Sequence, residues 1–213
     1  MRSNEGQLRA KERRRLVDPM TLALDPKTTA LLVMDMQSGI LDMLGDKKEA
    51  IVAQASKLLD AARKASVRVI YVVVGFRPGY PEVSPRNASF NSVRETGRFA
   101  AGSAGTEIHG ALAPRADEVV VTKHRVSAFA GTDLEMILRA NGIETLVLAG
   151  ISTSGVVTST VRHAADADYR IVIVEDGCAD GDAEVHRVLL EKVLARQAKV
   201  VKVADVTTAL AGG

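Results

Sequence analysis

Residues 145–160 read TLVLAGISTSGVVTST, which is an apolar run followed by a turn of small residues and the start of a helix. An uninterrupted apolar run is typical of a strand that is buried on both faces, as in a parallel sheet covered by helices. Five more runs rich in β-branched residues lie at 30–35, 67–74, 118–122, 170–175 and 199–203. Because amphipathic stretches separate these runs, the pattern predicts an α/β fold with a six-stranded parallel sheet and helices on both of its faces.

Helix start and stop signals agree with this alternation. Residues 48–65 carry apolar side chains at helical spacing. Thr132 and Glu135 form a capping-box pattern, in which each side chain can accept a hydrogen bond from a free backbone N–H of the first turn. Gly142 stands where a left-handed helix stop belongs, and Asp182 is the expected cap of a later helix.

The segment 75–105 has a different character. It holds Pro78, Pro81 and Pro85 together with several glycines, serines and asparagines, and it has no sustained periodicity. A connection of this length inside a compact domain is usually functional or mobile. We therefore expect a loop that overhangs the carboxyl ends of the strands.

Composition and charge limit the classes of partner. The chain has 213 residues, of which 46% are hydrophobic and 25% charged, and this mixture suits a single well-buried domain. Residues 1–15 hold six basic and two acidic side chains, whereas the rest of the chain holds 22 basic and 24 acidic ones. We expect a basic N-terminal arm at 1–20 and a folded domain at 21–210. The slightly acidic body offers no electrostatic footprint for nucleic acid.

The lengths of the apolar runs and the cysteine count lead to further expectations. No run reaches the roughly 18 apolar residues of a membrane span, so we expect no membrane partner. A single cysteine excludes an intramolecular disulfide and a multi-cysteine zinc site. It also fits a reducing compartment, and we expect a cytoplasmic protein.

Polar side chains follow three of the predicted strands. Asp35 and Gln37 come after the first strand, Lys123 comes after the third, and the turn 150–155 comes after the fourth. Ligands of open α/β sheets bind beyond the carboxyl ends of the strands, and a small-residue loop that opens a helix can bind an anion. The pattern therefore favours a polar site at this edge. The structural alternative is that Asp35 and Lys123 form only a buried salt bridge.

Three separated motifs carry a family resemblance. They are LLVMDMQ at 31–37, VVTKHRVSAFAGTDLE at 120–135 and VEDGCAD at 174–180. Together with the turn at 150–160, they resemble the isochorismatase-like, or cysteine hydrolase, superfamily. The resemblance implies a Rossmann-like three-layer α/β/α sandwich with strand order 3-2-1-4-5-6, and it implies that residues 21–210 form a hydrolase domain. It also implies a small-molecule substrate and a homo-oligomer.

The resemblance assigns roles to individual residues. Asp35 matches the aspartate that serves as general base, and Lys123 matches the lysine that stabilises the ionised site. A cis peptide is expected at Ile151–Ser152, and the backbone amides of Ser152 and Val156 are expected at the oxyanion hole. The expected pocket residues are Gln37, Phe129, Thr153 and Ser154.

One departure from the family pattern bears on the mechanism. The position that matches the nucleophilic cysteine holds Val156, which cannot form a thioester. Cys178 is expected to be a small buried hydrophobic residue. A hydroxyl such as that of Ser154 would need a positioned base within roughly 3 Å, and the structural alternative for Ser154 is helix capping.

Metals and cofactors are not expected. The loop GFRPGYPEVSPRN at 75–87 contains neither histidine nor aspartate, and nicotinamidases carry metal ligands at this place. The four histidines are scattered. We expect His124 to be exposed, the alternative being that it faces the pocket beside Lys123. We expect His163 and His186 to be structural, away from the strand ends. The chain also has no GxGxxG sequence and no phosphate-loop lysine.

Three functions remain open at this point. The first is a hydrolase without a cysteine nucleophile, in which a protonated Asp35 acts as an acid on an enol ether. The second is a catalytically inactive homologue that binds a small molecule. The third is an amidohydrolase in which Asp35 activates water directly, with Lys123 beside it.

Overall fold

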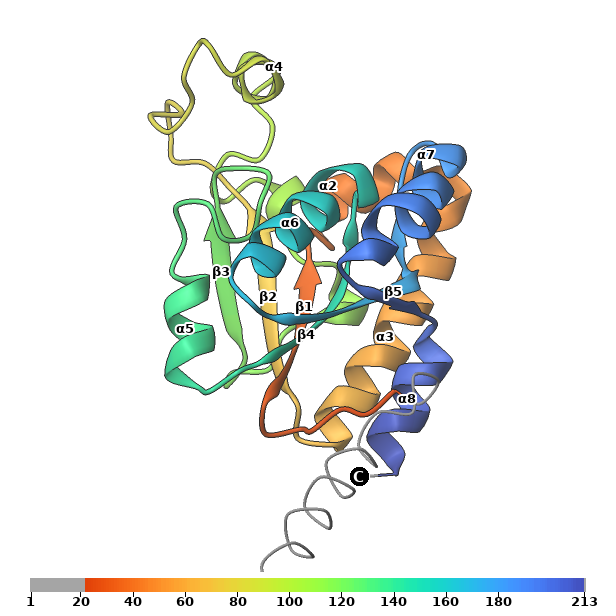
Figure 1. The fold of residues 1–213 in the computed structure, drawn as a ribbon. Helices are drawn as coiled ribbons and strands as arrows, with labels where there is room; N and C mark the ends of the chain where they lie inside the picture. The colour runs from red at the N-terminus through yellow and green to blue at the C-terminus, as the bar shows by residue number, and fades with distance from the viewer. Residues whose placement is uncertain (1–21, 213) are drawn as a thin grey trace, which may run out of the picture.

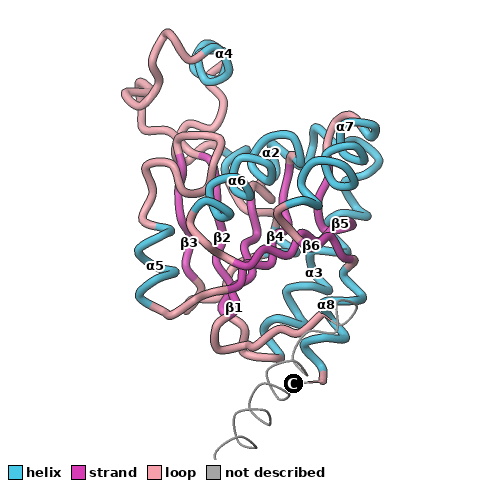
Figure 2. Tube along the Cα trace, in the orientation of Figure 1, coloured by secondary structure: helices cyan, strands magenta, loops and turns pink. Residues whose placement is uncertain are grey.

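The computed structural model describes residues 22–212, and six strands form its central sheet. Figure 2 shows these strands in magenta, running through the middle of the molecule with helices around them. The strands are β1 (Thr29–Met34), β2 (Arg68–Val74), β3 (Val119–Lys123), β4 (Thr145–Ile151), β5 (Arg170–Ala179) and β6 (Lys199–Val201). Their order is β3-β2-β1-β4-β5-β6, and all neighbouring strands are parallel. The predicted sheet is therefore confirmed, including the strand order.

Helices cover both faces of the sheet. One buried cluster joins the sheet to α3 (Lys48–Lys64) and α8 (Val203–Ala211). The other joins it to α5 (Leu134–Ala140), to α6 (Thr158–Asp166) and to the end of the helical segment after β5. That segment consists of α7 (Ala183–Val188), η5 (Leu189–Val193) and η6 (Leu194–Arg196). Apart from one helix in the segment after β2, the other short helical elements are α2 (Ser38–Leu41), η1 (Asp42–Lys47), η2 (Ala104–Thr106), η3 (Gly110–Leu112) and the π-helix η4 (Thr153–Val157).

The helix signals are confirmed at two positions and met only in part at a third. Gly142 has φ +63°, as a left-handed stop requires, and the Asp182 carboxylate accepts hydrogen bonds from two amides of α7. At Thr132 only half of the predicted capping box forms: α5 begins at Leu134, and the Leu134 amide donates to Thr132 Oγ1 at 3.3 Å. The same Thr132 hydroxyl donates its proton to Ala128 O, at 2.7 Å. The other half of the box is missing, because the Glu135 carboxylate pairs with Arg139 on the exposed face.

The long segment after β2 is not a loop throughout. It contains α4 (Ala88–Glu95), which is capped by the side chain of Asn87. Three side chains of the segment, Phe76, Val83 and Phe90, form a small buried cluster with Val74 at the end of β2. The expectation of an irregular connection is therefore corrected, because these apolar side chains, too widely spaced for a period, still form a core of their own. In Figure 1 the segment stands above the body, at the end toward which β1 points.

Two further expectations concern the basic N-terminal arm and membrane-spanning helices. The basic arm at 1–20 lies outside the described residues 22–212. Within those residues, no helix combines the length and the apolar character needed to cross a membrane.

Candidate functional site

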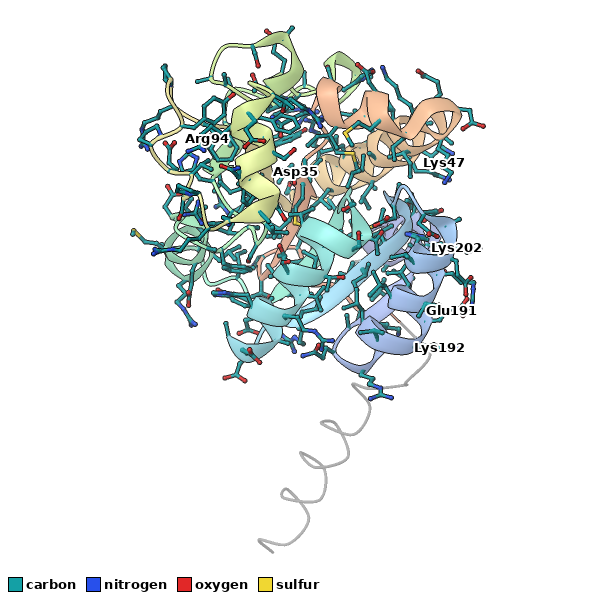
Figure 3. All side chains as sticks on the ribbon, turned by 90° about the horizontal axis from the view of Figure 1, so that it is seen from above. Asp35, Lys47, Arg94, Glu191, Lys192 and Lys202 are labelled. Carbon is teal, nitrogen blue, oxygen red and sulfur yellow. The ribbon has the colours of Figure 1, made fainter. Side chains whose placement is uncertain are left out.

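Asp35 and Lys123 form a buried ion pair at the carboxyl ends of β1 and β3. Lys123 Nζ lies 2.9 Å from Asp35 Oδ2, and the two residues are 3% and 5% exposed. Seen along the strands, Asp35 lies near the middle of the molecule, whereas the labelled Lys47, Arg94 and Lys202 lie toward its rim (Figure 3). The pair is therefore an interior feature.

The backbone at Asp35 is held in an uncommon conformation. Its φ is +56°, a region that side chains other than glycine rarely adopt. The Asp35 amide donates to Val72 O on β2, at 2.7 Å, so the strand pairing continues one residue beyond the end of β1. Backbone strain of this kind is concentrated at functional sites. It also turns the carboxylate away from the regular alternation of the strand.

The electrostatics of the pair leave one oxygen of the carboxylate free. Burial raises the pKa of Asp35 to about 6, against the opposing effect of the Lys123 ammonium. Lys123 Nζ also donates to Arg125 O, at 3.2 Å. Asp35 Oδ1 is buried and accepts no hydrogen bond from the described residues. A buried acceptor without a donor is costly, so this oxygen is suited to receive a proton or a polar ligand atom.

Gln37 lies beside the pair and connects three segments. Its Nε2 donates to Val74 O, at 2.9 Å, and to Thr106 O, at 2.8 Å. Its Oε1 accepts from the Val74 amide at 2.8 Å. The amide group is thus engaged on both sides, and it ties the ends of β1 and β2 to the segment at Thr106.

The turn after β4 contains a cis peptide between Ile151 and Ser152. The Ser152 hydroxyl accepts from the Gly155 amide at 3.1 Å and caps the helix that follows. The Ser154 amide donates to Asp180 Oδ2 at 2.7 Å, and Val156 is buried in the core. Ser152 is therefore the capping residue, and the expectation of a cap by Ser154 was wrong because the extended residue before the turn is Ser152.

His186 contradicts the expectation that it lies away from the strand ends. Its Nδ1 is 2.7 Å from Thr153 Oγ1. The reason is that α7 starts directly after β5, so its side chains lie over the carboxyl end of the sheet. Sequence reasoning missed this contact, and the order of strand, cap and helix around Asp182 is the signal that could have found it.

Gly150 is a second residue that the sequence argument did not single out. A Cβ at this position would lie 2.7 Å from Met34 O and 2.8 Å from Met34 Cβ. Glycine thus permits the close approach of β4 to β1 immediately before Asp35. A glycine inside a strand indicates such an approach, and this was the available signal.

A groove of about 660 Å³ runs along the edge of the sheet at β3. Its lining includes Thr122 of β3, Asp133 before α5, and Arg77 and His124 in the loops after β2 and β3. Its contact with the ion pair runs through Gly75, whose amide donates to Lys123 O at 3.2 Å. The groove therefore borders the ion pair and does not contain it.

His124 is partly buried in this groove, contrary to the expected surface position. Its Nδ1 lies 2.5 Å from Gly75 O, and its Nε2 lies 3.9 Å from the carboxylate of Glu82. The ring also packs against Phe76. The expectation was wrong because the segment after β2 folds back over the loop after β3.

Two other candidates lie in the core. Phe129 is buried and stacks face to face on His163, with the ring centroids 4.4 Å apart. Cys178 is 3% exposed, and burial raises the pKa of its thiol to about 12, so its prediction as a buried hydrophobic residue is confirmed. Among residues 22–212, no group of three or more His, Cys, Asp or Glu side chains is placed to hold a metal ion.

Comparisons with known proteins agree on one family. The profile of the Isochorismatase domain matches residues 29–205. The isochorismatase family protein YecD of Escherichia coli O157:H7 is 35% identical over 191 residues, which cover 89% of this chain and 100% of YecD. The ureidoacrylate amidohydrolase RutB of Acinetobacter baylyi is 33% identical over 192 residues, which cover 80% of this chain and 78% of RutB.

Solved structures of the same kind superpose on this chain. A cysteine hydrolase from Pseudomonas syringae pv. phaseolicola 1448A has a TM-score of 0.83 at 28% identity, covering 90% of this chain and 96% of its own. The N-carbamoylsarcosine amidase of Thermoplasma acidophilum has a TM-score of 0.68 at 31% identity, covering 83% and 96%. These relatives share the sheet described above.

Proposed function

The chain belongs to the isochorismatase family, and from this premise we propose that it hydrolyses a carbon–nitrogen bond of a small molecule, with water as the nucleophile and Asp35 as the general base. The observation that carries the proposal is the free Asp35 Oδ1, which is buried and unpartnered beside a cation. A base with a pKa of about 6 is mostly ionised at neutral pH and can still return its proton.

Water is the nucleophile in this proposal because the turn offers no activated side chain. The Ser152 and Ser154 hydroxyls lie 3.5 Å apart, and neither has a base among its hydrogen-bond partners in the described residues. Val156 takes the position that matches the family's cysteine and carries no reactive atom. The Cys178 thiol is buried, and its raised pKa keeps it protonated. The Thr153 hydroxyl is fully buried and already has two hydrogen-bond partners.

The proposed reaction has two steps. Asp35 Oδ1 takes a proton from water as the water oxygen adds to the carbonyl carbon of the substrate. The family resemblance implies that the oxyanion forms at the backbone amides of Ser152 and Val156. The Ser154 and Gly155 amides already donate to other groups. The carbon–nitrogen bond then breaks, and Asp35 returns the proton to the leaving nitrogen. Lys123 holds the other carboxylate oxygen, which keeps Asp35 ionised and oriented.

The substrate class follows from the names of two relatives. RutB acts on ureidoacrylate, and the amidase acts on N-carbamoylsarcosine, so both names contain a carbamoyl group on nitrogen. We extend this class to the present chain and infer a small ureido or N-carbamoyl compound as its substrate. The unpartnered Asp35 oxygen is compatible with the N–H donors of such a group.

A second candidate function is that of a binding homologue without turnover. The observation in its favour is the ion pair, in which both charges are buried and in direct contact, while the groove lies beside them. The acid mechanism on an enol ether is less favoured, because the Lys123 ammonium stabilises the ionised form of Asp35.

Ammonia release from a panel of ureido and N-carbamoyl acids tests the proposal. We expect turnover by the natural chain and a loss of at least about 100-fold in Asp35→Asn, which keeps the shape but cannot accept the proton. Binding of the same compounds in calorimetry without any turnover would support the binding homologue instead. Turnover that survives in Asp35→Asn would remove Asp35 from its role.

Three expectations stay predictions. They are a homo-oligomer, cytoplasmic localisation and activity without a cofactor. Light scattering of the purified chain tests the first, and activity after dialysis against a chelator tests the last.

A further inference from the structure

The turn after β4 is fastened to the segment that follows β5. The His186 ring and the Asp180 carboxylate of that segment contact the turn, and so does Ala179 O at the end of β5. We propose that His186 is a positioning residue, whose Nδ1–H donates to Thr153 Oγ1 and so fixes the backbone that carries the oxyanion amides. This inference rests on the function proposed above, because it concerns the same turn.

The direction of the hydrogen bond follows from counting protons. Thr153 Oγ1 lies 3.2 Å from Ala179 O and 2.7 Å from His186 Nδ1. A hydroxyl has one proton, and a carbonyl oxygen can only accept. Both contacts are satisfied together when the hydroxyl donates to Ala179 O and the imidazole donates to the hydroxyl. The neutral ring must therefore carry its proton on Nδ1.

Burial makes this arrangement stiff. Thr153 is 0% exposed, so water cannot replace a lost partner of its hydroxyl without opening the core. On the backbone side, the Thr158 hydroxyl donates to Thr153 O at 2.7 Å. Thr153 is thus held at its side chain from β5 and α7 and at its carbonyl from α6. Its side chain cannot rotate without breaking one of these bonds.

The carboxylate of Asp180 also holds the turn in place. Asp180 Oδ2 accepts from the Ser154 amide at 2.7 Å, and Oδ1 accepts from the Asp182 amide at 3.3 Å. Burial alone raises the pKa of Asp180, but the hydrogen bonds from Ser154 and Asp182 hold it below its ordinary range. The carboxylate is therefore charged at neutral pH, and it connects the turn to the start of α7, where His186 lies.

The position of the turn is expected to affect stabilisation of the transition state more than binding of the substrate. The Ser152 amide comes directly before Thr153 and the Val156 amide lies three residues after it in the same turn. A displacement of about 1 Å in such donors costs up to about 100-fold in rate. Loss of the His186 bond is therefore expected to lower kcat and to leave KM nearly unchanged. Thr153 itself does not attack the substrate, because its hydroxyl is enclosed.

Imidazole nitrogen spectroscopy tests the proton position directly and needs no substrate. The chain has four histidines, so His186→Asn identifies the His186 signals by their disappearance. Burial lowers the pKa of His186, and the ring is therefore neutral at pH 7.5. We expect its proton on Nδ1 and a bare Nε2. A proton on Nε2, or rapid exchange between the two forms, would overturn the proposal.

Matched variants test the positioning role. Asparagine places an amide N–H near the position of Nδ1, so His186→Asn is expected to keep kcat within about threefold, whereas His186→Leu lowers it about tenfold or more, as loss of a buried hydrogen bond does. Thr153→Val is expected to lose the same factor, and the double variant to lose no more than either single one. His109→Asn removes the half-buried imidazole that caps η3, where asparagine can also accept the hydrogen bond from the Ala111 amide, and serves as the control.

The outcomes separate this proposal from the proposed function. Equal losses in His186→Asn and His186→Leu, or additive losses in the double variant, would reject the positioning role while leaving the reaction intact. If the natural chain turns over no substrate, amide exchange of residues 152–156 decides. We then expect faster exchange in His186→Leu than in His186→Asn, and equal rates would reject the proposal.

Discussion

Lys123 Nζ lies 2.9 Å from Asp35 Oδ2, although Asp35 follows β1, Lys123 ends β3, and β2 lies between these two strands. The long lysine side chain crosses the end of β2 to reach the carboxylate. It occupies one oxygen, and the other stays without a partner in the interior. The two oxygens of Asp35 are thus different in kind, one structural and one available for chemistry.

The first prediction is a pH dependence of the rate. Only ionised Asp35 accepts a proton from water, and burial raises its pKa to about 6, so kcat/KM is expected to rise with pH and to level off above about pH 7. The measurement is a rate profile from pH 4.5 to 8.5 on a ureido substrate. A rate that is highest below pH 6 would instead indicate acid catalysis by protonated Asp35.

The second prediction concerns stability without the lysine. Asp35 has a folded-state pKa above its ordinary value, so the folded chain holds this proton more tightly than the unfolded chain, and this contribution is lost as pH rises through about 6. Lys123→Met removes the group that opposes this shift. We expect the free energy of unfolding to fall by about 3–5 kcal/mol at pH 8 and by clearly less at pH 5.

Urea unfolding at both pH values measures this difference. Lys48→Met is the matched control, because Lys48 pairs with Asp42 at the surface, where the carboxylate is 63% exposed. We expect no measurable change for the control at either pH. A loss in Lys123→Met that is the same at pH 5 and pH 8 would mean that the pair is not electrostatically coupled.

The third prediction is resistance to thiol reagents. Cys178 is buried, and with a pKa of about 12 only about one thiol in ten thousand is ionised at pH 8. Iodoacetamide is expected to leave the native chain unlabelled and fully active over hours, and to label the urea-unfolded chain. Inactivation that proceeds in step with labelling would identify Cys178 as a reactive residue and would contradict hydrolysis by water.

The fourth prediction concerns the contact between β1 and β4. In Gly150→Ala the new methyl group meets Met34 O at 2.7 Å, and backbone cannot yield there without moving a strand. We expect a loss of about 1–3 kcal/mol in the free energy of unfolding, and a lower rate, since Asp35 follows Met34 directly. Gly110→Ala is the control, because nothing lies within 4 Å of a Cβ there. A neutral Gly150→Ala would show that the strands can separate freely.

The sheet was predictable because its signals are local. Each apolar run is a strand in the structure, within a few residues, and Gly142 and Asp182 end and start helices as expected. The observed ends of the strands differ from the predicted ones where tertiary contacts intervene. β1 stops at Met34 because Asp35 takes a positive φ, and β5 extends to Ala179 because it continues beside β4.

The candidate site was predictable only as a list of residues. The sequence places Asp35, Lys123 and the turn at strand ends, and the resemblance supplies their expected roles. The sequence contains no sign of the groove beside β3, and it does not show that His124 lies within that groove. Both depend on how the segment after β2 folds back, and no local pattern records that.

By itself the amino-acid sequence determined which segments are strands, which are helices, and that they alternate, since hydrophobic periodicity and capping act between residues a few positions apart. The tertiary structure alone decided that one oxygen of Asp35 stays unpartnered and that His186 reaches Thr153. These contacts join residues far apart in the chain. They arise only when the strand order and the helices packed on the sheet bring the ends of separate elements within hydrogen-bonding distance.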